Sequence, residues 1–412
     1  MISIHHPTKV LEGIINLPSS KSISNRMLIL QKLYEPNLQL ENVSEANDSI
    51  VLQKLLASDS GDLDVEDAGT VFRFMVAYCS CTLGNWKIDG SERLRKRPIS
   101  QLVDALRILG AEIEYLNEEG FAPLSITGCE LQAHQNEIDL RDAKSSQFVS
   151  ALLLISPKIK GEFTIRINSN MPSYSYVGLT ISCMRRVGFS LWKQGSFLRV
   201  SKKQRFDGEF FKIEPDWTSF YYWFSMVHLA DEVDLFFPGL RLNNIQKEKN
   251  LLFRVGSVAV RFQEENDGIR FTKKDKSEVV YPDKMNFAQF PDSSMTFVVL
   301  LASVTEGVIE FTGLESLKYK ECDREEALGY HLSKLGVDFH FNKDSWIIDA
   351  ACFKISKNIV FPTYDDHRMA MSIAPLALLS QIIVQDPSVV KKSYPRFWRD
   401  LESVGFEIKE LN

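Results

Sequence analysis

One pattern of apolar and polar positions recurs along the chain: a segment with helical spacing ends at a glycine, and a segment that alternates with period two follows. The five copies are ALRILGAEIEYL (105–116), CMRRVGFSLWKQ (183–194), LLFRVGSVAVRF (251–262), HLSKLGVDFHFN (331–342) and DLESVGFEIKEL (400–411). A glycine just past a helix end can adopt the left-handed backbone that closes the helix. The alternation that follows predicts a half-buried strand. The five glycines are Gly110, Gly188, Gly256, Gly336 and Gly405.

These glycines are spaced about 70–80 residues apart, which is longer than the repeat of a solenoid protein. Each unit is therefore expected to be a small βαβ-type subdomain, and the whole chain to be a modular α/β protein. A sixth unit would fit near residues 45–66, although SDSGDLDV is a poor copy of the pattern. The alternative is that any α/β chain contains several such junctions by chance.

Composition narrows the class of protein. The 412 residues are enough for two or three domains, and the apolar share of 44% with a charged share of 25% is typical of a globular protein with real cores. The formal net charge of −6 argues against a nucleic-acid binder, which usually carries a basic excess. Any site for an anion must then be built locally from a few cations.

The cysteines and the N-terminus favour a cytoplasmic protein. Six cysteines are scattered without a CxxC pair, as expected in a reducing compartment. The N-terminal MISIHHPTKVLEG lacks the apolar segment of a signal peptide. Apolar runs such as FVVLLASV (297–304) are too short to span a bilayer, so we expect no membrane association.

The first polar cluster is LPSSKSISNR (17–26), where Lys21 and Arg26 enter a predicted helix. A helix N-terminus offers free N–H groups and a positive dipole end to an anion, so two cations in its first turns are locally unfavourable. Residues that break a local rule are candidates for function. A solvated helix cap explains the stretch about equally well.

Two further helix starts carry polar groups. EDAGTVFRFMVAY (66–78) places Gly69 and Thr70 before an apolar run, with Arg73 on the same helical face. DAKSSQFVSALLL (142–154) sets two serines and a glutamine at the entry of another apolar helix. Each could hold an anion or a polyol. Each could also be an ordinary turn or N-cap.

The last clusters are charged. YKECDREEA (319–327) places Lys320, Glu321 and Arg324 within about one helical turn. YDDHRMAMS (364–372) packs acid, imidazole and guanidinium directly before an apolar helix. Solvated charge runs are usually looser than this and are not followed at once by apolar helices, so these clusters favour a functional site.

The clusters together indicate a small, highly anionic ligand or pair of ligands. No His, Cys or Asp grouping has metal-ligand spacing, and no GxGxxG or Walker pattern occurs, so we expect neither a metal nor a nucleotide cofactor. Asp292 and Glu321 are candidates for general acid and base groups. The candidate cations are Lys21, Arg26, Arg73, Arg97, Lys320, Arg324, Arg368 and Lys392.

Seven motifs occur in order along the chain: LPSSKSISNR, DAGTVFR, RPI (97–99), SSQF (145–148), PDSSMT (291–296), YKECDR and DDHRMAM. From Leu17 to about Phe397 they resemble the 5-enolpyruvylshikimate-3-phosphate (EPSP) synthase family. The resemblance implies transfer of the enolpyruvyl group of phosphoenolpyruvate to the 5-hydroxyl of shikimate 3-phosphate, in the shikimate pathway of aromatic amino acid biosynthesis. It also implies a monomeric enzyme without a cofactor, whose partners are these two small molecules.

The same resemblance implies a fold. The family has a two-domain, inside-out α/β barrel with six βαβαββ subdomains, three in each domain. Carried over here, domain I would hold residues 1–19 and 216–412, and domain II residues 20–215. Each domain would carry half of the site, in a cleft that closes on substrate.

Residue by residue, the resemblance implies two binding sets. Shikimate 3-phosphate would be held by Lys21, Ser22, Arg26, Ser145, Ser146, Gln147, Ser173, Tyr176, Asp292, Ser316 and Lys320. Phosphoenolpyruvate would meet Lys21, Gly69, Thr70, Arg97, Gln147, Arg324, His367, Arg368 and Lys392.

Our hypothesis for catalysis assigns four groups. Asp292 would take the proton of the attacking hydroxyl, while Glu321 with Lys21 would protonate C3 of phosphoenolpyruvate. His367 would assist near the leaving phosphate. Two phosphates and two carboxylates meet during this reaction, so many cations must offset their repulsion, and arginine suits a bidentate grip on such groups.

A few positions depart from the family pattern without removing a predicted catalytic group. Asp67, Phe74 and Ser316 stand where the family usually has Asn, Pro and Asn. SYSY (173–176) replaces SKPY or SRPY, and YDDHR replaces YNDHR.

Two alternatives stay open. One is the sister enzyme that moves the same group onto UDP-N-acetylglucosamine; that family uses a cysteine on a flexible glycine-rich loop, and no cysteine here has such a setting. The other is a non-catalytic anion-binding homologue, against which the intact set of Lys21, Asp292, Glu321 and Lys392 argues.

Overall fold

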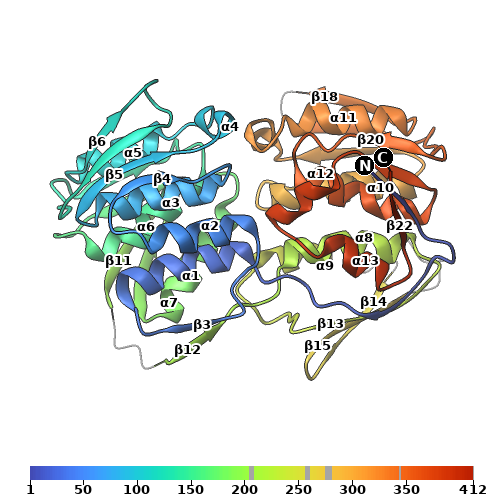
Figure 1. Ribbon diagram of the computed structural model, residues 1–412, viewed down its shortest axis with the longest axis horizontal. Coiled ribbons are helices and arrows are strands. Elements are labelled where there is room, and N and C mark those ends of the chain that lie inside the picture. Colours follow the sequence, from blue (N-terminus) through green and yellow to red (C-terminus); the bar gives the residue numbers. More distant parts are fainter. Residues whose placement is uncertain (204–207, 256–259, 274–280, 343–344, 412) are drawn as a thin grey trace. The chain divides into compact units, whose positions relative to one another are not determined.

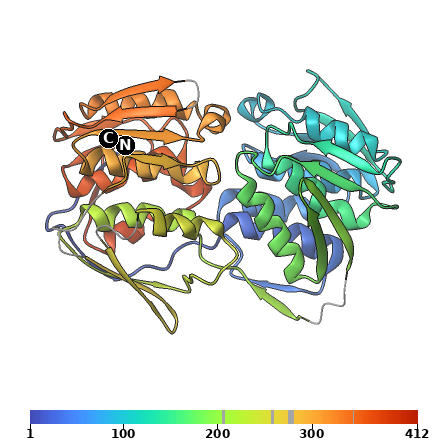
Figure 2. The same cartoon turned by 180° about the vertical axis from the view of Figure 1, so that it is seen from behind.

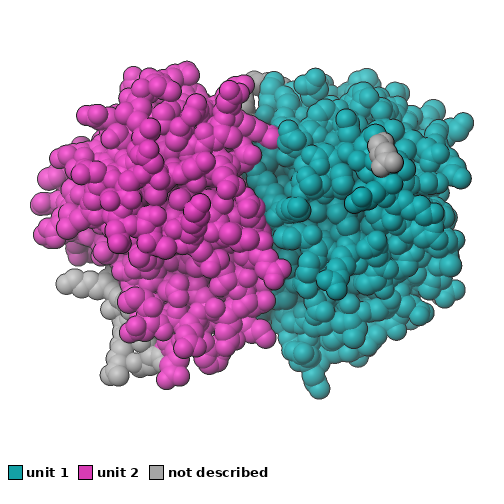
Figure 3. All heavy atoms as spheres, viewed as in Figure 1, with its two compact units in different colours: residues 1–18, 214–412 teal, residues 19–213 magenta. Residues whose placement is uncertain are grey.

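The computed structural model describes residues 1–203, 208–255, 260–273, 281–342 and 345–411. The chain divides into two compact units (Figure 3). Unit 1 comprises Met1–Pro18 and Glu214–Asn412, and unit 2 comprises Ser19–Ile213. The sequence-based expectation placed the divisions after residues 19 and 215.

The strands are short, as in a chain of small subdomains. Those of unit 2 are β3 (Gln39–Glu41), β4 (Gly61–Asp64), β5 (Gly84–Asp89), β6 (Glu112–Tyr115), β7 (Leu124–Gly128), β8 (Glu137–Leu140), β9 (Thr164–Ile167), β10 (Phe189–Gln194), β11 (Phe197–Lys203) and β12 (Phe210–Lys212). Those of unit 1 are β1 (Ile2–His5), β2 (Val10–Ile14), β13 (Glu232–Pro238), β14 (Val260–Glu265), β15 (Gly268–Lys273), β16 (Lys284–Asn286), β17 (Val308–Thr312), β18 (Asp338–Asn342), β19 (Ser345–Asp349), β20 (Ile359–Phe361), β21 (Ile382–Val384) and β22 (Glu407–Glu410).

Helices alternate with these strands. Those of unit 2 are α1 (Lys21–Tyr34), α2 (Asn47–Leu56), α3 (Gly69–Ser80), α4 (Glu92–Arg95), α5 (Ser100–Ile108), α6 (Ser146–Ile155) and α7 (Tyr174–Arg186), with the 3₁₀ turn η1 (Ser156–Lys158). Those of unit 1 are α8 (Trp217–Leu229), α9 (Asn250–Val255), α10 (Ser294–Val304), α11 (Arg324–Lys334), α12 (His367–Ile373) and α13 (Phe397–Glu402), with the 3₁₀ turns η2 (Lys247–Lys249), η4 (Pro291–Ser293), η5 (Glu315–Tyr319), η6 (Ala374–Leu378) and η7 (Pro387–Lys392).

Five four-stranded sheets among the described residues share one topology: a parallel pair of strands continues into two antiparallel neighbours. The orders are β4-β5-β7-β6 and β10-β11-β9-β8 in unit 2, and β14-β15-β13-β2, β16-β17-β19-β18 and β20-β21-β1-β22 in unit 1. A sixth sheet in the described part of the chain is the parallel pair β12-β3. The repeated α/β subdomain is thus confirmed, and its sixth copy has a smaller sheet.

The glycine junctions explain how each helix turns into its strand. Gly110, Gly188, Gly336 and Gly405 have φ angles of 91°, 88°, 71° and 99°, the left-handed region in which a side chain is strained. Each lies between a helix and a strand, as the pattern predicted. Gly256 lies outside the described residues.

The stretch near residues 45–66 has a different role from the one predicted. It holds α2 followed by β4, but β4 pairs in parallel with β5 and so begins the next sheet. The junction therefore leads from one subdomain into the next.

Several helices are buried on all sides, which places them inside their unit. All residues of α8 and α12 are buried in unit 1. In unit 2, α3 is buried except at Thr70, and α6 except at Gln147. Strands such as β13 instead alternate between buried and exposed positions, so the sheets face outward and the arrangement is inside-out. Figure 1 shows α1, α2 and α3 side by side, and Figure 2 shows the green helix α7 beside the hairpin β10-β11.

Aromatic packing around α8 forms the centre of unit 1. Phe220 contacts the rings of Phe237 and Phe271 at centroid distances of 5.2 and 4.7 Å. Burying one such side chain contributes about 1.5–3 kcal/mol to stability. Among the described residues, no helix is both long and apolar enough to cross a membrane.

Candidate active site

A buried arginine organises the charged cluster of unit 1. Arg324 begins α11 and is completely buried. Its Nε lies 2.7 Å from Asp366 Oδ2, its Nη2 2.7 Å from Glu321 Oε2, and its Nη1 3.2 Å from Asp292 Oδ1. Burial alone would lower the pKa of this guanidinium, but the three carboxylates raise it well above its ordinary value. Arg324 is therefore a permanent cation that holds three acids in place.

Asp292 lies in η4, just before α10, and is contacted by two further cations. Lys320 Nζ is 3.5 Å from its Oδ1, and Arg368 Nη2 is 3.4 Å from its Oδ2. Arg368 also donates to the backbone carbonyl of Asp292 at 2.9 Å. Burial would raise the pKa of the Asp292 carboxyl, but Lys320, Arg368 and Arg324 hold it far below its usual range. The carboxylate is thus ionised and fixed in position.

Asp366 connects the buried arginine to α12. Its Oδ1 accepts a hydrogen bond from the backbone N–H of Arg368 at 2.9 Å and so caps the helix. The same Oδ1 lies 3.7 Å from His367 Nδ1. Asp366 and His367 are both buried, but 3.7 Å is longer than a hydrogen bond, so this contact is electrostatic only.

Glu321 shares this cluster. Its Oε1 lies 4.0 Å from Lys392 Nζ in η7, while its other oxygen binds Arg324. Ser316 belongs to η5, and its Oγ is buried without a hydrogen-bond partner among the described residues. A buried hydroxyl without a partner is unusual and is explained most simply if a ligand completes it.

In unit 2, the N-terminus of α1 carries an ion pair. Lys21 Nζ lies 3.0 Å from Asp48 Oδ2 at the start of α2. The side chains are 20% and 7% exposed, so the ammonium group remains partly accessible. Asp48 offsets the unfavourable position of a cation at a helix N-terminus.

Arg26 lies deeper in unit 2 and binds several elements. It donates from Nε to Thr180 Oγ1 at 2.7 Å and from Nη1 to the Ser22 carbonyl at 2.7 Å. Its Nη2 lies 3.2 Å from the Tyr176 carbonyl, and its guanidinium is 5.4 Å from the centre of the Phe74 ring. Arg26 is only 3% exposed, so these contacts make it a link between α1 and α7.

The turn at Gly69 lies directly against the side chain of Arg97. A Cβ atom at Gly69 would overlap the Arg97 guanidinium, so the absence of a side chain allows the guanidinium to lie against the start of α3. Arg73, one turn later, donates from Nη1 to the Gly69 carbonyl at 3.0 Å and from Nη2 to the Pro98 carbonyl at 2.8 Å. A cation thus lies beside a helix N-terminus, a combination that suits an anion.

The starts of α6 and α7 supply neutral polar groups. Ser145 caps α6 by accepting from the Gln147 N–H at 3.3 Å, and Gln147 Nε2 donates to Thr70 Oγ1 of α3 at 2.9 Å. Ser173 precedes α7 with a φ of 61°, a left-handed conformation that is costly for a residue other than glycine. Such strain often marks a binding site. Ser146 is buried, whereas Tyr176 is half-buried.

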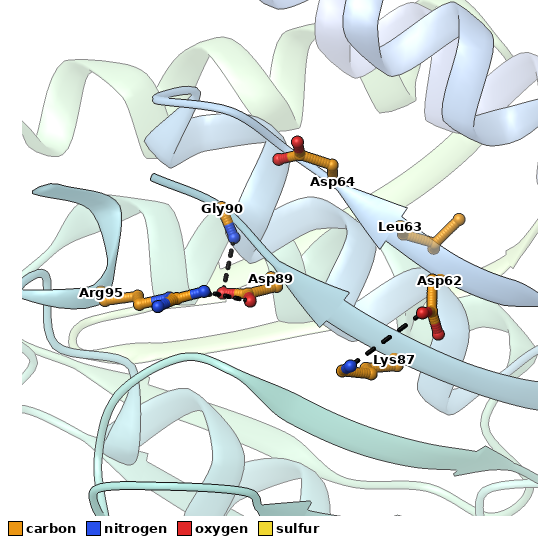
Figure 4. A pocket seen from close by; sticks show the side chains of 7 residues that line it. All are labelled: Asp62, Leu63, Asp64, Lys87, Asp89, Gly90 and Arg95. Carbon is orange, nitrogen blue, oxygen red and sulfur yellow. Dashed lines mark hydrogen bonds and ion pairs between the residues drawn. The ribbon is translucent and has the colours of Figure 1, made fainter. Parts of the chain in front are cut away.

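A surface pocket lies beside β4 and β5 (Figure 4). It is lined by Asp62, Leu63, Asp64, Lys87, Asp89, Gly90 and Arg95. Figure 4 shows two ion pairs in it, Arg95 with Asp89 at 2.6 Å and Lys87 with Asp62 at 4.0 Å. None of the predicted site residues lines this pocket, so it is not a candidate for the anion site.

The predicted residues fall into two clusters, one in each unit. Unit 1 brings together Asp292, Ser316, Lys320, Glu321, Arg324, His367, Arg368 and Lys392; unit 2 holds Lys21, Ser22, Arg26, Gly69, Thr70, Arg97, Ser145, Ser146, Gln147, Ser173 and Tyr176. Sequence reasoning assigned no role to Asp48, Asp366 or Thr180. Asp366 had a signal, because it directly precedes His367 and Arg368. Asp48, in the first turn of α2, and Thr180, within α7, had no signal in the sequence.

Three comparisons place the chain among known proteins. The family model described as EPSP synthase (3-phosphoshikimate 1-carboxyvinyltransferase) matches residues 50–401. A 3-phosphoshikimate 1-carboxyvinyltransferase of Bacteroides fragilis strain YCH46 is 40% identical over 405 residues, 97% of either chain. One of Photobacterium damsela subsp. piscicida is 28% identical over 430 residues, 97% of this chain and 98% of the relative. The solved structure of an EPSP synthase from Acinetobacter baumannii matches with a TM-score of 0.77, 20% identity and 99% coverage of both chains.

Proposed function

The chain belongs to the EPSP synthase family, and from that premise we propose that it transfers the enolpyruvyl group of phosphoenolpyruvate to the 5-hydroxyl of shikimate 3-phosphate, releasing phosphate. The observation that carries this proposal is the cluster around Arg324. Two carboxylates, Asp292 and Glu321, bind the same buried guanidinium. Further cations contact each of them from neighbouring elements. Acid–base groups and anion-binding groups therefore share one place, as this reaction requires.

The first step forms a tetrahedral intermediate. The 5-hydroxyl oxygen attacks C2 of phosphoenolpyruvate, its proton passes to Asp292, and C3 gains a proton from the protonated carboxyl group of Glu321. The second step breaks the bond between C2 and the phosphate oxygen while C3 returns a proton to Glu321, and the proton on Asp292 passes to the leaving phosphate. Phosphate leaves near His367, and the products are the enolpyruvyl ether and inorganic phosphate.

The cations around Asp292 also affect its strength as a base. Lys320, Arg324 and Arg368 hold its pKa far below the usual range, so the carboxylate alone is a weak base. We propose that the phosphate and carboxylate groups of the substrates bind the same cations. Their charge would offset the field at Asp292 and raise its pKa towards a useful value, so that proton transfer follows binding of both substrates.

The remaining groups would bind and orient the substrates. The Gly69–Arg97 turn, with Thr70 and Gln147, suits phosphoenolpyruvate, because it pairs a guanidinium with a helix N-terminus. The hydroxyls of Ser22, Ser145, Ser146, Ser173, Tyr176 and Ser316 suit the phosphate and ring oxygens of shikimate 3-phosphate. Arg26 would act mainly by holding these elements together.

The test is release of phosphate from phosphoenolpyruvate in the presence of each acceptor. We expect release with shikimate 3-phosphate and none with UDP-N-acetylglucosamine. Release with the UDP-sugar alone would support the sister activity instead. Absence of release with both acceptors, from protein that binds phosphoenolpyruvate, would indicate a non-catalytic anion-binding homologue.

A further inference from the structure

Arg73 is a buried arginine that connects two separate segments of unit 2. It lies in α3 and is 3% exposed. One arm of its guanidinium donates to the Gly69 carbonyl at 3.0 Å, and the other donates to the Pro98 carbonyl at 2.8 Å. The first carbonyl belongs to the turn that begins α3, and the second follows Arg97 directly. The planar fork of Arg73 therefore fixes the distance between the glycine turn and the Arg97 segment.

The charge of Arg73 has no acidic partner in the part of the chain that the structure describes. Among the described residues, neither Arg73 nor Arg97 forms an ion pair, and the buried Nε of Arg73 has no hydrogen-bond partner. Burial and the neighbouring Arg97 lower the pKa of the Arg73 guanidinium well below its ordinary value. Two arginines that lie close together without a carboxylate between them create a positive potential. An incoming anion can neutralise this potential.

The position of Arg97 depends on this link. Its guanidinium occupies the space that a Cβ of residue 69 would fill, and no hydrogen bond to the described residues holds its side chain there. The backbone that follows Arg97, in contrast, is held by the hydrogen bond from Arg73 to the Pro98 carbonyl. Repulsion between the two guanidinium groups would direct the Arg97 guanidinium away from Arg73 and from the protein interior.

We propose that Arg73 is a positioning residue for phosphoenolpyruvate, which acts by holding the Arg97 segment against the Gly69 turn and by adding uncompensated positive charge behind it. This inference rests on the proposed function. It assigns Arg73 no contact with the reacting atoms.

The test is a KM-against-kcat comparison of Arg73→Lys. The ammonium group of lysine keeps the charge but lacks the rigid planar fork, so the distance between the Gly69 turn and the Arg97 segment is no longer fixed. We expect KM for phosphoenolpyruvate to rise about tenfold, as for the loss of one buried hydrogen bond that positions a ligand group. KM for shikimate 3-phosphate and kcat should change by less than about twofold. Calorimetric binding of phosphoenolpyruvate should weaken by the same factor.

Arg107→Lys, at an exposed position, is the control. Arg107 also lies in unit 2 and donates twice to a backbone carbonyl, that of Ile113, at 3.2 and 2.6 Å. It belongs to α5, and we expect its variant to keep both KM values. Equal effects of the two variants would overturn the proposal, because they would show a general cost of losing an arginine.

A double-mutant cycle of Arg73→Lys with Arg97→Met tests whether Arg73 acts through Arg97. If Arg73 acts through Arg97, Arg73→Lys adds no further increase in KM for phosphoenolpyruvate once Arg97 is removed. Additive increases would overturn the proposal. If the wild-type protein is active and Arg73→Lys leaves KM for phosphoenolpyruvate unchanged, this inference alone is overturned. A wild-type protein that neither binds phosphoenolpyruvate nor releases phosphate from it would overturn the proposed function as well.

Discussion

The two units hold their candidate cations in opposite ways. In unit 1, the cluster combines three carboxylates with four cations. One of these cations, Arg324, contacts Asp292, Glu321 and Asp366 at the same time. In unit 2, Arg73 binds backbone carbonyls, and neither it nor Arg97 has an acidic partner within the described residues. Lys21 is the exception, since it pairs with Asp48.

This difference indicates a division of labour. A cluster in which acids and cations nearly balance holds each carboxyl group at a fixed place, which suits proton transfer at defined atoms. A cluster with uncompensated positive charge gains free energy when an anion arrives, which suits substrate capture. Removing an acid from unit 1 should therefore damage turnover or folding, whereas disturbing an arginine of unit 2 should mainly weaken binding.

The largest effect is expected at Asp292. Asp292→Asn removes the proposed base, so kcat for phosphate release should fall about 10³-fold, within the range for a lost general base. The dissociation constant of phosphoenolpyruvate should stay the same or decrease, because Lys320 and Arg368 lose a competing carboxylate. Assays of phosphate release measure kcat, and calorimetry measures the dissociation constant of phosphoenolpyruvate. Asp283→Asn, at an exposed position of the same unit, is the control, and near-normal turnover of Asp292→Asn would exclude the assignment.

The second effect concerns the folding of unit 1. Asp366 and Arg324 are both fully buried, and Asp366→Ala leaves a buried guanidinium short of one carboxylate. We expect the free energy of unfolding of unit 1 to fall by about 3 kcal/mol. Denaturant titration followed by hydrogen exchange measures this loss for each unit. Asp89→Ala breaks the exposed pair with Arg95 and should have a much smaller effect; equal losses would contradict the argument.

Acid should destabilise unit 1 before unit 2. Burial lowers the pKa of His228 and of His331 to about 4, and both lie in unit 1. The unfolded chain binds these protons from about pH 6.5 downward, so the stabilising effect of each neutral imidazole is lost progressively between about pH 6.5 and 4. Each group then costs up to about 1.4 kcal/mol per pH unit in that window. The histidine of unit 2, His134, is exposed.

Hydrogen exchange at pH 7 and pH 5 compares the two units directly. Protection in unit 1 should decrease more than protection in unit 2. His331→Gln, whose amide can still donate to the Pro362 carbonyl, should reduce that decrease. Earlier loss of protection in unit 2 would show that other groups dominate the acid response.

The sequence predicted what local patterns can encode. Alternation and glycine placement predicted the helix–strand junctions, and four of them have the expected left-handed glycine. The polar motifs predicted which helix starts carry charged groups. The partners of those groups were not predictable, because pairs such as Arg324 with Asp366 or Lys21 with Asp48 join residues from separate helices. Such pairs depend on how helices pack, which a one-dimensional pattern does not contain.

Arg26, which is predicted to bind shikimate 3-phosphate, shows the same limit. Its place in the first turns of a helix is visible in the sequence, but Thr180 and Ser150, to which it donates, lie far along the chain. A cation near a helix N-terminus is therefore a signal for a site, but it does not distinguish a residue that touches the ligand from one that holds the site together.

The smallest effect separates binding from folding in unit 2. Gly69→Ala places a methyl group where the Arg97 guanidinium lies, and the flexible end of that side chain can move away at little cost in stability. The displaced guanidinium no longer faces the start of α3, so we expect KM for phosphoenolpyruvate to rise about tenfold, equivalent to about 1.4 kcal/mol. The melting temperature should stay nearly unchanged, because alanine is favoured over glycine in a helix. Gly178→Ala, within α7 and with open space at the Cβ position, is the control and should leave KM unaltered. A lower melting temperature with unchanged KM would mean that Gly69 serves folding, and the contrast between the two units would then lose its clearest support.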